Sequence, residues 1–321
     1  SVFVGFTLFI FIGMDVLTKF NIRYVLDRTK KIHVIMASLL GALPGCGGAI
    51  IVVTQYIQGR ISFGSLVAVL TATMGDAAFL LLAAEPKTGL FIFALGGAVG
   101  ALSGYVVDKI HGISYLRGNS KINVVFEKLK KNFISKFNIF WTLIFLPGFV
   151  IGIFVAFQQD LDLILKIPEG FSLVASLGLA GATLSIFMWS LNPLSDFQSS
   201  TDRTRNLLSR VVDTTNFVTT WVICGFLVFE IFIHITSYDL KTFFDIWLPF
   251  VPLIAILFGF LPGCGPQIVV TTFYLNGFIP LSAEIGNAIS NDGDALFPAI
   301  ALAPKAAIIA TLYSAIPAFI F

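Results

Sequence analysis

Charged residues are scarce in this chain. Asp, Glu, Lys and Arg make up 12% of the 321 residues, and hydrophobic residues make up 57%. A soluble domain carries roughly 25% charged residues, and the mean hydropathy here is +0.92. A soluble globular fold is therefore excluded. The composition predicts an integral membrane protein, which we expect in the cytoplasmic (inner) membrane of a bacterium.

Several functional classes lack the residues that they need. Three cysteines without framework spacing argue against structural disulfides. No phosphate-binding Gly-Lys-Ser/Thr loop is present, so a nucleotide-driven pump is not expected. No histidine cluster or nucleophile–base pair indicates an enzyme. We therefore predict a non-enzymatic protein with no cofactor and no nucleic-acid partner. Its partners are the lipid bilayer and a small ion or small-molecule substrate, and homo-oligomerisation stays open.

Long apolar runs account for most of the chain. Each is continuous rather than alternating, which favours membrane helices over a β-barrel because backbone in hydrocarbon must satisfy its own hydrogen bonds. The sequence predicts an all-α polytopic membrane protein with about ten hydrophobic segments. These are 2–18, 33–57, 61–84, 88–107, 139–157, 170–191, 214–235, 247–276, 280–302 and 305–321.

One stretch occurs twice. Gly41–Lys87 aligns with Gly259–Lys305 without a gap at an offset of 218 residues, and 19 of 47 positions are identical. The matches include a Pro-Gly-Cys-Gly motif and a Gly-Asp-Ala step. Apolar sequence gives chance matches of Leu or Val, but not of Pro, Gly, Cys and Asp in register. We conclude that the chain is built from two repeats.

The loop charges set the orientation of the repeats. Loops 19–31, 108–137 and 192–213 are rich in Lys and Arg, whereas 158–169 and 236–246 are acidic. The positive-inside rule places the first three in the cytoplasm and the other two outside. Three hydrophobic segments separate two cytoplasmic loops, so one segment in each repeat must fail to cross. The repeats are then inverted in topology, as in many secondary transporters.

This topology divides the chain into four parts. Residues 1–107 form an N-terminal membrane repeat, and 108–137 form a basic cytoplasmic linker. Residues 138–213 hold two connecting transmembrane helices with a cytoplasmic loop, and 214–321 form a C-terminal membrane repeat. The re-entrant piece is either the hairpin 33–57 with its tip at the Pro-Gly-Cys-Gly motif, which we favour, or 61–84.

The strongest candidates for a site lie at the two motifs. Proline and glycine break helices, and broken helices expose free N–H groups and carbonyls near the membrane centre. The predicted helix-break backbone is Pro44, Gly45, Gly47, Pro262, Gly263 and Gly265. Cys46 and Cys264 occupy equivalent positions and could offer two thiolates to a soft or borderline metal. Their alternative role is as small apolar filler.

Carboxylates inside apolar segments are costly and point to function. Asp76 and Asp294 are equivalent, and Asp292 adds another carboxylate. With the two cysteines, Asp76 and Asp294 form the predicted metal ligands. Further ion-binding candidates are Asn287, Asn291, Thr54, Thr272 and Gln267, and the last of these takes the place of Ala49. Glu284 replaces Leu66, so the second repeat is the more polar of the two.

The duplicated Leu-Pro-Gly-Cys-Gly segments followed by Gly-Asp steps resemble the family of ten-helix heavy-metal exporters, whose members are also labelled manganese transporters. The resemblance covers nearly the whole chain. It implies a membrane transporter of a heavy-metal ion and supplies no ligand set.

Two functional hypotheses follow. The first is a secondary transporter that exports a divalent metal, with proton coupling through an intramembrane Asp. Manganese fits if the cysteines are filler, and a softer metal fits if they are ligands. The second is a proton- or sodium-coupled transporter of an organic anion, which the broken-helix N-termini would hold.

Overall fold

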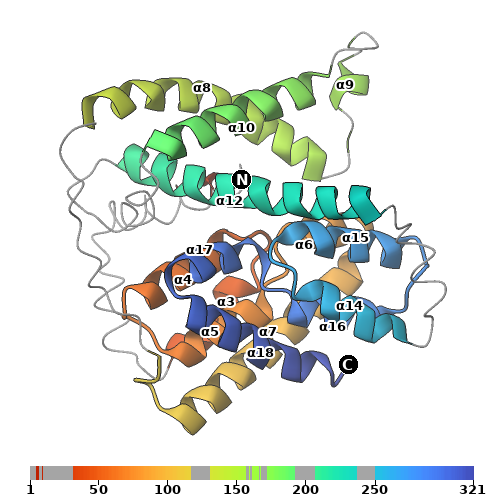
Figure 1. The fold of residues 1–321 in the computed structure, drawn as a ribbon. Helices are drawn as coiled ribbons and strands as arrows, with labels where there is room; N and C mark the ends of the chain where they lie inside the picture. The colour runs from red at the N-terminus through yellow and green to blue at the C-terminus, as the bar shows by residue number, and fades with distance from the viewer. Residues whose placement is uncertain are drawn as a thin grey trace. The chain divides into compact units, whose positions relative to one another are not determined.

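The computed structural model describes residues 5, 6, 9, 32–116, 131–156, 159, 161–165, 167, 172–191, 207–236 and 250–321. Within these residues the chain forms helices joined by turns, with no strand (Figure 1). The predicted all-α membrane fold is thus confirmed. The first predicted segment, 2–18, and the loops 19–31 and 236–246 lie almost entirely outside the described residues.

Three of the described helices are long and apolar enough to cross a bilayer. They lie at Pro86–His111, Asn138–Val155 and Leu173–Leu191. A fourth crossing is formed if Phe63–Ala72 and Ala77–Ala84 act as one span, bent by 41° at the break between them. The first of these helices, α7, has 26 residues and is therefore about 39 Å long, which exceeds the hydrocarbon thickness of a bilayer.

The chain divides into two compact units, the first being Ser1–Asn21 with Lys121–Ile223. This unit holds α8 (Lys131–Ala156), α9 (Leu161–Ile164), α10 (Leu173–Leu191) and the first part of α12 (Leu207–Thr236). α8 packs against α10. The Trp141 indole N–H donates to Oδ1 of Asn216 at 2.9 Å, which satisfies both of these buried polar groups.

The second unit, Ile22–Ser120 with Cys224–Phe321, contains both repeats. Their helices lie at equivalent positions. Adding 218 to the first and last residue of a helix in the first repeat gives those of its counterpart in the second repeat, with differences of one residue at ends beside a motif. The last helix of each repeat is the exception, because these two share only their starting position. In the first repeat the helices are α3 (His33–Gly41), α4 (Gly47–Ile57), α5 (Phe63–Ala72), α6 (Ala77–Ala84) and α7 (Pro86–His111). In the second they are α14 (Val251–Gly259), α15 (Cys264–Leu275), α16 (Leu281–Ser290), η2 (Gly293–Ala295) with α17 (Leu296–Leu302), and the shorter α18 (Pro304–Ala318).

Small residues let α5 and α7 approach backbone to backbone. A Cβ at Gly104 would lie 2.3 Å from the carbonyl oxygen of Gly64, and one at Gly100 would lie 2.5 Å from that of Ala68. Glycines four residues apart on one helix face allow such packing in membranes. Because residue numbers rise on α5 as they fall on α7, the two helices are antiparallel, and α5 ends beside the middle of α7.

α3 and α4 form a hairpin. Val34 lies against Gly104, and the Ser38 hydroxyl donates to the carbonyl of Gly97, so α3 runs in the same direction as α5. α4 returns, because the Tyr56 hydroxyl donates to the carbonyl of Leu116, just beyond the C-terminal end of α7. The tip of this hairpin is residues 42–46, level with the middle of α7.

The second repeat makes the corresponding hairpin from α14 and α15. Its helix α15 ends elsewhere: the Tyr274 hydroxyl donates to Oε2 of Glu85 at 3.0 Å, just before the N-terminal end of α7. Tyr274 is the equivalent of Tyr56, since 56 plus 218 is 274. Equivalent tyrosines therefore bond at opposite ends of α7, and α4 and α15 run from the middle of that helix toward opposite ends.

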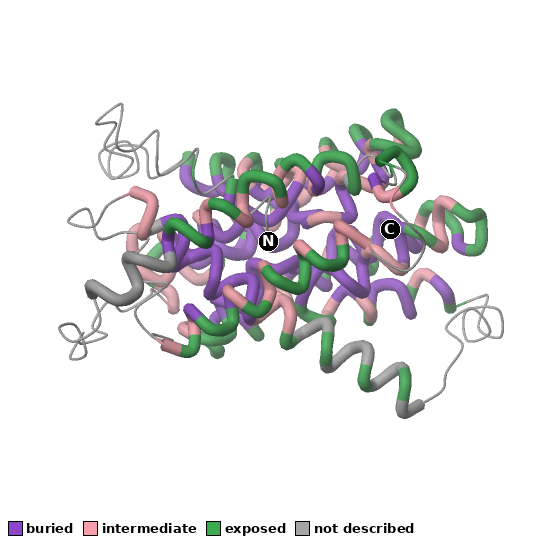
Figure 2. Tube along the Cα trace, turned by 90° about the horizontal axis from the view of Figure 1, so that it is seen from above, coloured by how far each residue is buried: buried purple, intermediate pink, exposed green. Residues whose placement is uncertain are grey.

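The outer helices of this unit, such as α7, face protein on one side only, whereas α5 is buried along its whole length. On α7 the buried residues include Gly96, Gly100 and Gly104, while large apolar side chains such as Leu90 and Leu102 are exposed. Figure 2 shows buried and exposed stretches alternating along the same helices. A surface of exposed Leu, Phe and Ile is what a helix presents to lipid, where apolar side chains need no protein cover.

Candidate metal site

Each repeat breaks its helices twice at the same depth. The first break is residues 42–46, where Pro44 lacks a backbone donor and Gly45 takes a left-handed φ of 87°. The second is residues 73–76, where Gly75 has φ of 53°. The N–H of Gly45 donates to the carbonyl of Gly75 at 3.0 Å, so the two breaks are joined. In the second repeat the equivalent residues Gly263 and Gly293 also have positive φ, of 104° and 58°.

Four helices begin at these breaks. α4 follows Cys46 and α6 follows Asp76, while α15 begins at Cys264 and η2 begins at Gly293. The first turn of a helix has free N–H groups and a positive partial charge. The breaks therefore gather positive partial charge at the depth where the sequence places its cysteines and aspartates.

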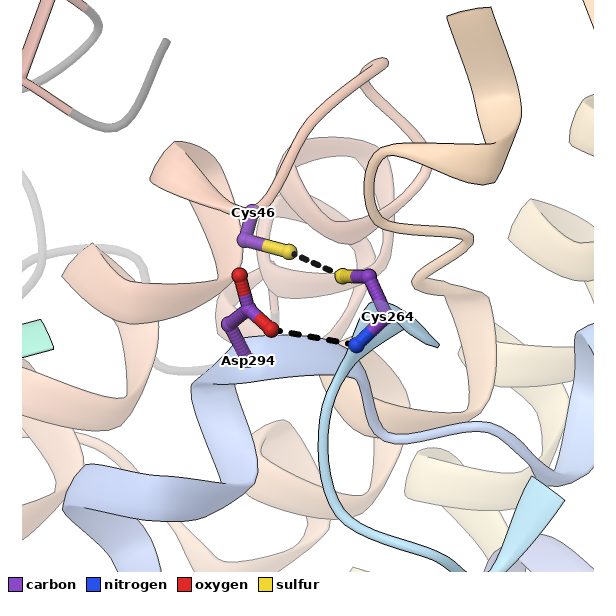
Figure 3. A group of neighbouring side chains, drawn as sticks. All are labelled: Cys46, Cys264 and Asp294. Atoms are coloured by element: carbon purple, nitrogen blue, oxygen red, sulfur yellow. Dashed lines mark hydrogen bonds between the residues drawn. The ribbon is translucent and has the colours of Figure 1, made fainter. Parts of the chain in front are cut away.

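Cys46, Cys264 and Asp294 meet in a buried group, the cysteine–aspartate cluster (Figure 3). The two Sγ atoms are 3.1 Å apart. The backbone N–H of Cys264 donates to Oδ1 of Asp294 at 3.1 Å. One candidate ligand atom from each residue lies within 4.8 Å of the others. Both repeats contribute to the cluster, one cysteine from each, so neither repeat holds it alone.

Two glycines leave room for the sulfur atoms. A Cβ at Gly75 would lie 2.3 Å from Sγ of Cys264 and 3.1 Å from Sγ of Cys46. A Cβ at the equivalent Gly293 would lie 3.4 Å from Sγ of Cys46 and 2.9 Å from Cγ2 of Thr73. Both glycines also have positive φ, which side chains rarely adopt. Gly75 and Gly293 were not among the predicted site residues, although the repeated Gly-Asp step contains them.

Asp76 lies beside the cluster. A Cβ at Gly45 would lie 4.0 Å from Oδ1 of Asp76, just as one at Gly263 would lie 3.7 Å from Oδ1 of Asp294. The charge of Asp76 acts on both cysteines and on Asp294. Its Oδ1 is buried and accepts no hydrogen bond from the described residues. A buried carboxylate oxygen without a donor is costly unless something else binds it.

The other predicted ligands divide into those near the breaks and those turned away. The Asp292 carboxylate accepts hydrogen bonds from the hydroxyls of Thr311 and Ser314, and so faces α18 rather than the cysteines. Thr54 and Thr272 donate to the carbonyls of Ile50 and Ile268, four residues earlier on their own helices. These bonds occupy each hydroxyl hydrogen inside its helix.

The remaining candidates lie in the second repeat. Oδ1 of Asn291 accepts from the N–H of Gly293 at 2.5 Å, which shapes the second break. Nδ2 of Asn287 donates to the carbonyl of Ala255 at 2.7 Å and holds α16 to α14. Gln267 is buried on α15 and its side-chain amide has no hydrogen-bond partner among the described residues. Pro44, Gly47, Pro262 and Gly265 lie at the breaks or in the first turn after them.

The donor set has a clear chemical preference. Two thiolates with one or two carboxylates suit a soft or borderline divalent cation of the zinc type, whereas oxygen-only sites suit magnesium, calcium and manganese. Both cysteines stand at helix N-termini, where free backbone N–H groups carry a positive partial charge. Burial removes competing water and strengthens each interaction with the bound charge.

The whole chain, residues 1–321, matches the sequence model of a family described as "Putative, 10TM heavy-metal exporter". No curated protein and no solved structure matches the chain.

Proposed function

The chain belongs to this family of heavy-metal exporters, and from this premise we propose that it is a secondary transporter that exports a soft or borderline divalent cation. The cation is held by the cysteine–aspartate cluster, with Asp76 as a further carboxylate donor. The observation that carries the proposal is the meeting of two buried cysteines and a carboxylate at three helix starts. Manganese is the less suitable substrate because it prefers oxygen ligands.

The same geometry disfavours an organic-anion substrate. An anion would need a free helix N-terminus, but the N-terminus of α15 already binds the carboxylate of Asp294. Asp76 is the residue before α6, and its side chain makes no capping hydrogen bond. A second carboxylate brought here would meet these two charges and would be repelled. Cations are attracted by the same arrangement.

We also propose that the two repeats are inverted in the membrane and that the hairpins α3–α4 and α14–α15 are re-entrant. The bonding of Tyr56 and Tyr274 at opposite ends of α7 supports this, because it directs the open ends of the two hairpins to opposite faces. The loop charges then place the open end of α3–α4 in the cytoplasm and that of α14–α15 outside. A central site between inverted repeats can open to either face in turn.

A labelling experiment tests the orientation. Gln58 and Asn276 are equivalent residues that follow α4 and α15. In a Cys224→Ser background, Gln58→Cys is expected to react with a membrane-impermeant maleimide only from the cytoplasmic face, and Asn276→Cys only from outside. Intact cells and inverted vesicles provide the two faces. Labelling of both positions from one face would contradict the inverted arrangement.

Proton coupling follows from the ligand chemistry. Cysteine binds metal as thiolate, so each thiol releases its proton when the cation arrives, and a proton must return when the cation leaves. Asp294 can hold such a proton between cycles, because a buried carboxyl group without a bound cation is more stable when neutral. Cation movement in one direction is thereby linked to proton movement in the other.

Transport into liposomes tests the function itself. Purified protein should move zinc or cadmium down an imposed gradient more rapidly than manganese, as followed with an encapsulated metal-sensitive dye. Asp76→Asn with Asp294→Asn should reduce zinc flux to that of protein-free vesicles, since the cation then lacks carboxylate charge in a buried site. Glu85→Gln removes an exposed carboxylate at the end of α6; it is the matched control and should retain flux.

Zinc flux that survives the double Asp substitution would refute the proposed site. Flux of amphipathic carboxylates alone would favour the organic-anion hypothesis.

A further inference from the structure

The two repeats differ most in the interface between the second hairpin helix and the next helix. In the first repeat α4 and α5 meet through apolar side chains. In the second repeat α15 and α16 carry polar residues at the equivalent positions, and all are fully buried. The replacements are Gln267 for Ala49, Thr271 for Val53, Glu284 for Leu66 and Asn287 for Val69.

We call these four side chains, together with Asn291, the polar strip; Asn287 is bonded to α14 rather than to α15. The Thr271 hydroxyl donates to Oε1 of Glu284 at 2.9 Å, which fixes the two helices in register. α15 and α16 are joined by residues 276–280 and run antiparallel, so Gln267 and Asn287 both lie one turn closer to the breaks. Cys264 and Asn291 follow at the next turn. The strip thus leads from Glu284 to the cysteine–aspartate cluster.

Five polar atoms of the strip lack hydrogen-bond partners among the described residues. Oε2 of Glu284, both polar atoms of the Gln267 amide, Oδ1 of Asn287 and Nδ2 of Asn291 are buried and unpaired among the described residues. A membrane protein tolerates such atoms only at a cost, and leucine and valine serve at the same positions in the first repeat. The residues are therefore not needed for packing.

The polar side chains of the strip are spread along the helix rather than gathered around one point, as the ligands of a metal ion would be. From Glu284 to Asn291 is seven helical residues, or about 10 Å. A hard metal ion needs several oxygens around one point, whereas contact between strip side chains is shown only for Thr271 and Glu284. Unpaired polar atoms at successive turns are suited to ordering water molecules between them, since a buried water needs two to four such partners.

Glu284 has no positive counterpart in the described residues. Of the helices packed against α16, α5 and α14 carry no titratable side chain. Among the titratable groups described on α7, α15 and α18, Tyr274 is the one whose charge interacts with Glu284. A buried carboxylate without a cation beside it is stable in its neutral, protonated form.

We propose that Glu284 is the proton-uptake site of the exporter and that the polar strip delivers its proton to the cysteine–aspartate cluster. The inference rests on the proposed function. The strip opens toward the same end of α7 as Tyr274 and Glu85, which the loop charges place outside. A proton from outside binds the Glu284 carboxylate and passes along the strip. Two protons delivered in this way bind the cluster thiolates or carboxylates as the divalent ion leaves, so the charges balance.

Two transport modes in liposomes separate this role from a structural one. Glu284→Gln should abolish zinc accumulation driven by a pH gradient, reducing it to the level of protein-free vesicles. It should preserve zinc–zinc exchange at equal pH, which needs no net proton movement, and should leave zinc affinity unchanged. Glu284→Asp keeps a carboxylate and should retain part of the pH-driven accumulation. Glu85→Gln is the control for loss of a carboxylate near the same face.

A second readout needs no transport. Infrared difference spectra between alkaline and acidic buffer should show a protonated-carboxyl band in the wild type that Glu284→Gln removes and Glu85→Gln retains. Wild-type pH-driven accumulation in Glu284→Gln, or an unchanged infrared band, would overturn the inference. So would accumulation driven by a sodium gradient and lost in Glu284→Gln, because the ligand would then be sodium. Absence of zinc flux in the wild-type protein would refute the proposed function. The infrared band would still show whether Glu284 is protonated.

Discussion

Replacement of both Cys46 and Cys264 by serine is expected to abolish the binding of thiophilic cations. Serine preserves the size of the side chain but offers a neutral hydroxyl in place of a thiolate, so the site loses both soft ligands. The affinity for cadmium should fall by more than the roughly 10–100-fold that loss of an outer-shell partner costs a metal site. Isothermal titration of the detergent-purified protein measures this loss. The thiolate-to-cobalt charge-transfer bands should disappear in parallel.

Single substitutions sharpen the result. Because each repeat supplies one cysteine, Cys46→Ser and Cys264→Ser should each weaken binding, and neither should retain wild-type affinity. Cys224→Ser is the control, since Cys224 is exposed on α12 and outside the cluster. If the double variant bound cadmium with unchanged affinity, the cysteines would be small packing residues and the carboxylates alone would have to hold the substrate.

Gly75→Ala is expected to have the second large effect. Its new methyl group would lie 2.3 Å from Sγ of Cys264 and 3.1 Å from Sγ of Cys46, so the sulfurs must move apart or the break must shift. The left-handed φ of 53° adds backbone strain of order 1–3 kcal/mol. Zinc flux and cadmium affinity should both fall, because the cluster depends on the close approach of the two hairpin tips.

The equivalent substitution in the second repeat separates the effect of backbone strain from the effect of a methyl group placed against the sulfur atoms. Gly293→Ala has a similar φ of 58°, but its methyl group would meet Cγ2 of Thr73 at 2.9 Å and Sγ of Cys46 only at 3.4 Å. Both variants should lose similar thermal stability, whereas Gly75→Ala should lose much more metal affinity. Thermal melting and cadmium titration of the two proteins give the comparison. Equal affinity losses would show that strain, rather than the methyl group near the sulfurs, is responsible.

Much of the site was accessible from the sequence because the duplication marks it. Residues matched at a fixed offset within apolar sequence must share a structural role, and this drew attention to Cys46, Cys264 and Asp294, which the structure brings together. The helical class followed from the hydrophobic runs. The bounds of α5 and α16 agree at an offset of 218, although none of their ten aligned residues is identical.

A break inside 61–84 was expected only under the alternative in which that segment is the re-entrant hairpin. Residues 61–84 have a continuous apolar pattern, and the pattern contains no proline to stop a helix between Thr73 and Asp76. What ends α5 there is the left-handed Gly75, together with the hydrogen bond from Gly45 in the neighbouring break. Long-range contacts of this kind are not encoded in hydrophobic periodicity.

The orientation of Asp292 also depended on tertiary structure. It lies two residues before Asp294, and sequence alone placed both carboxylates in one site. In the structure the backbone turns at Gly293, so the Asp292 carboxylate is directed to the hydroxyls of α18 instead. Two residues in a turn can face opposite directions, and the φ of the glycine between them decides which.

The apolar interface between α4 and α5 gives the polar strip a wider significance. A molecule with perfect two-fold symmetry would offer the same chemistry to the cytoplasm and to the exterior, and it could not distinguish one direction of transport from the other by structure. A preferred direction of transport must therefore depend on the residues at which the two repeats differ. Of the 47 aligned positions, 19 are identical and 28 differ. Under the proposed inverted arrangement, the four polar replacements buried on α15 and α16 make the external half of the protein chemically different from the cytoplasmic half.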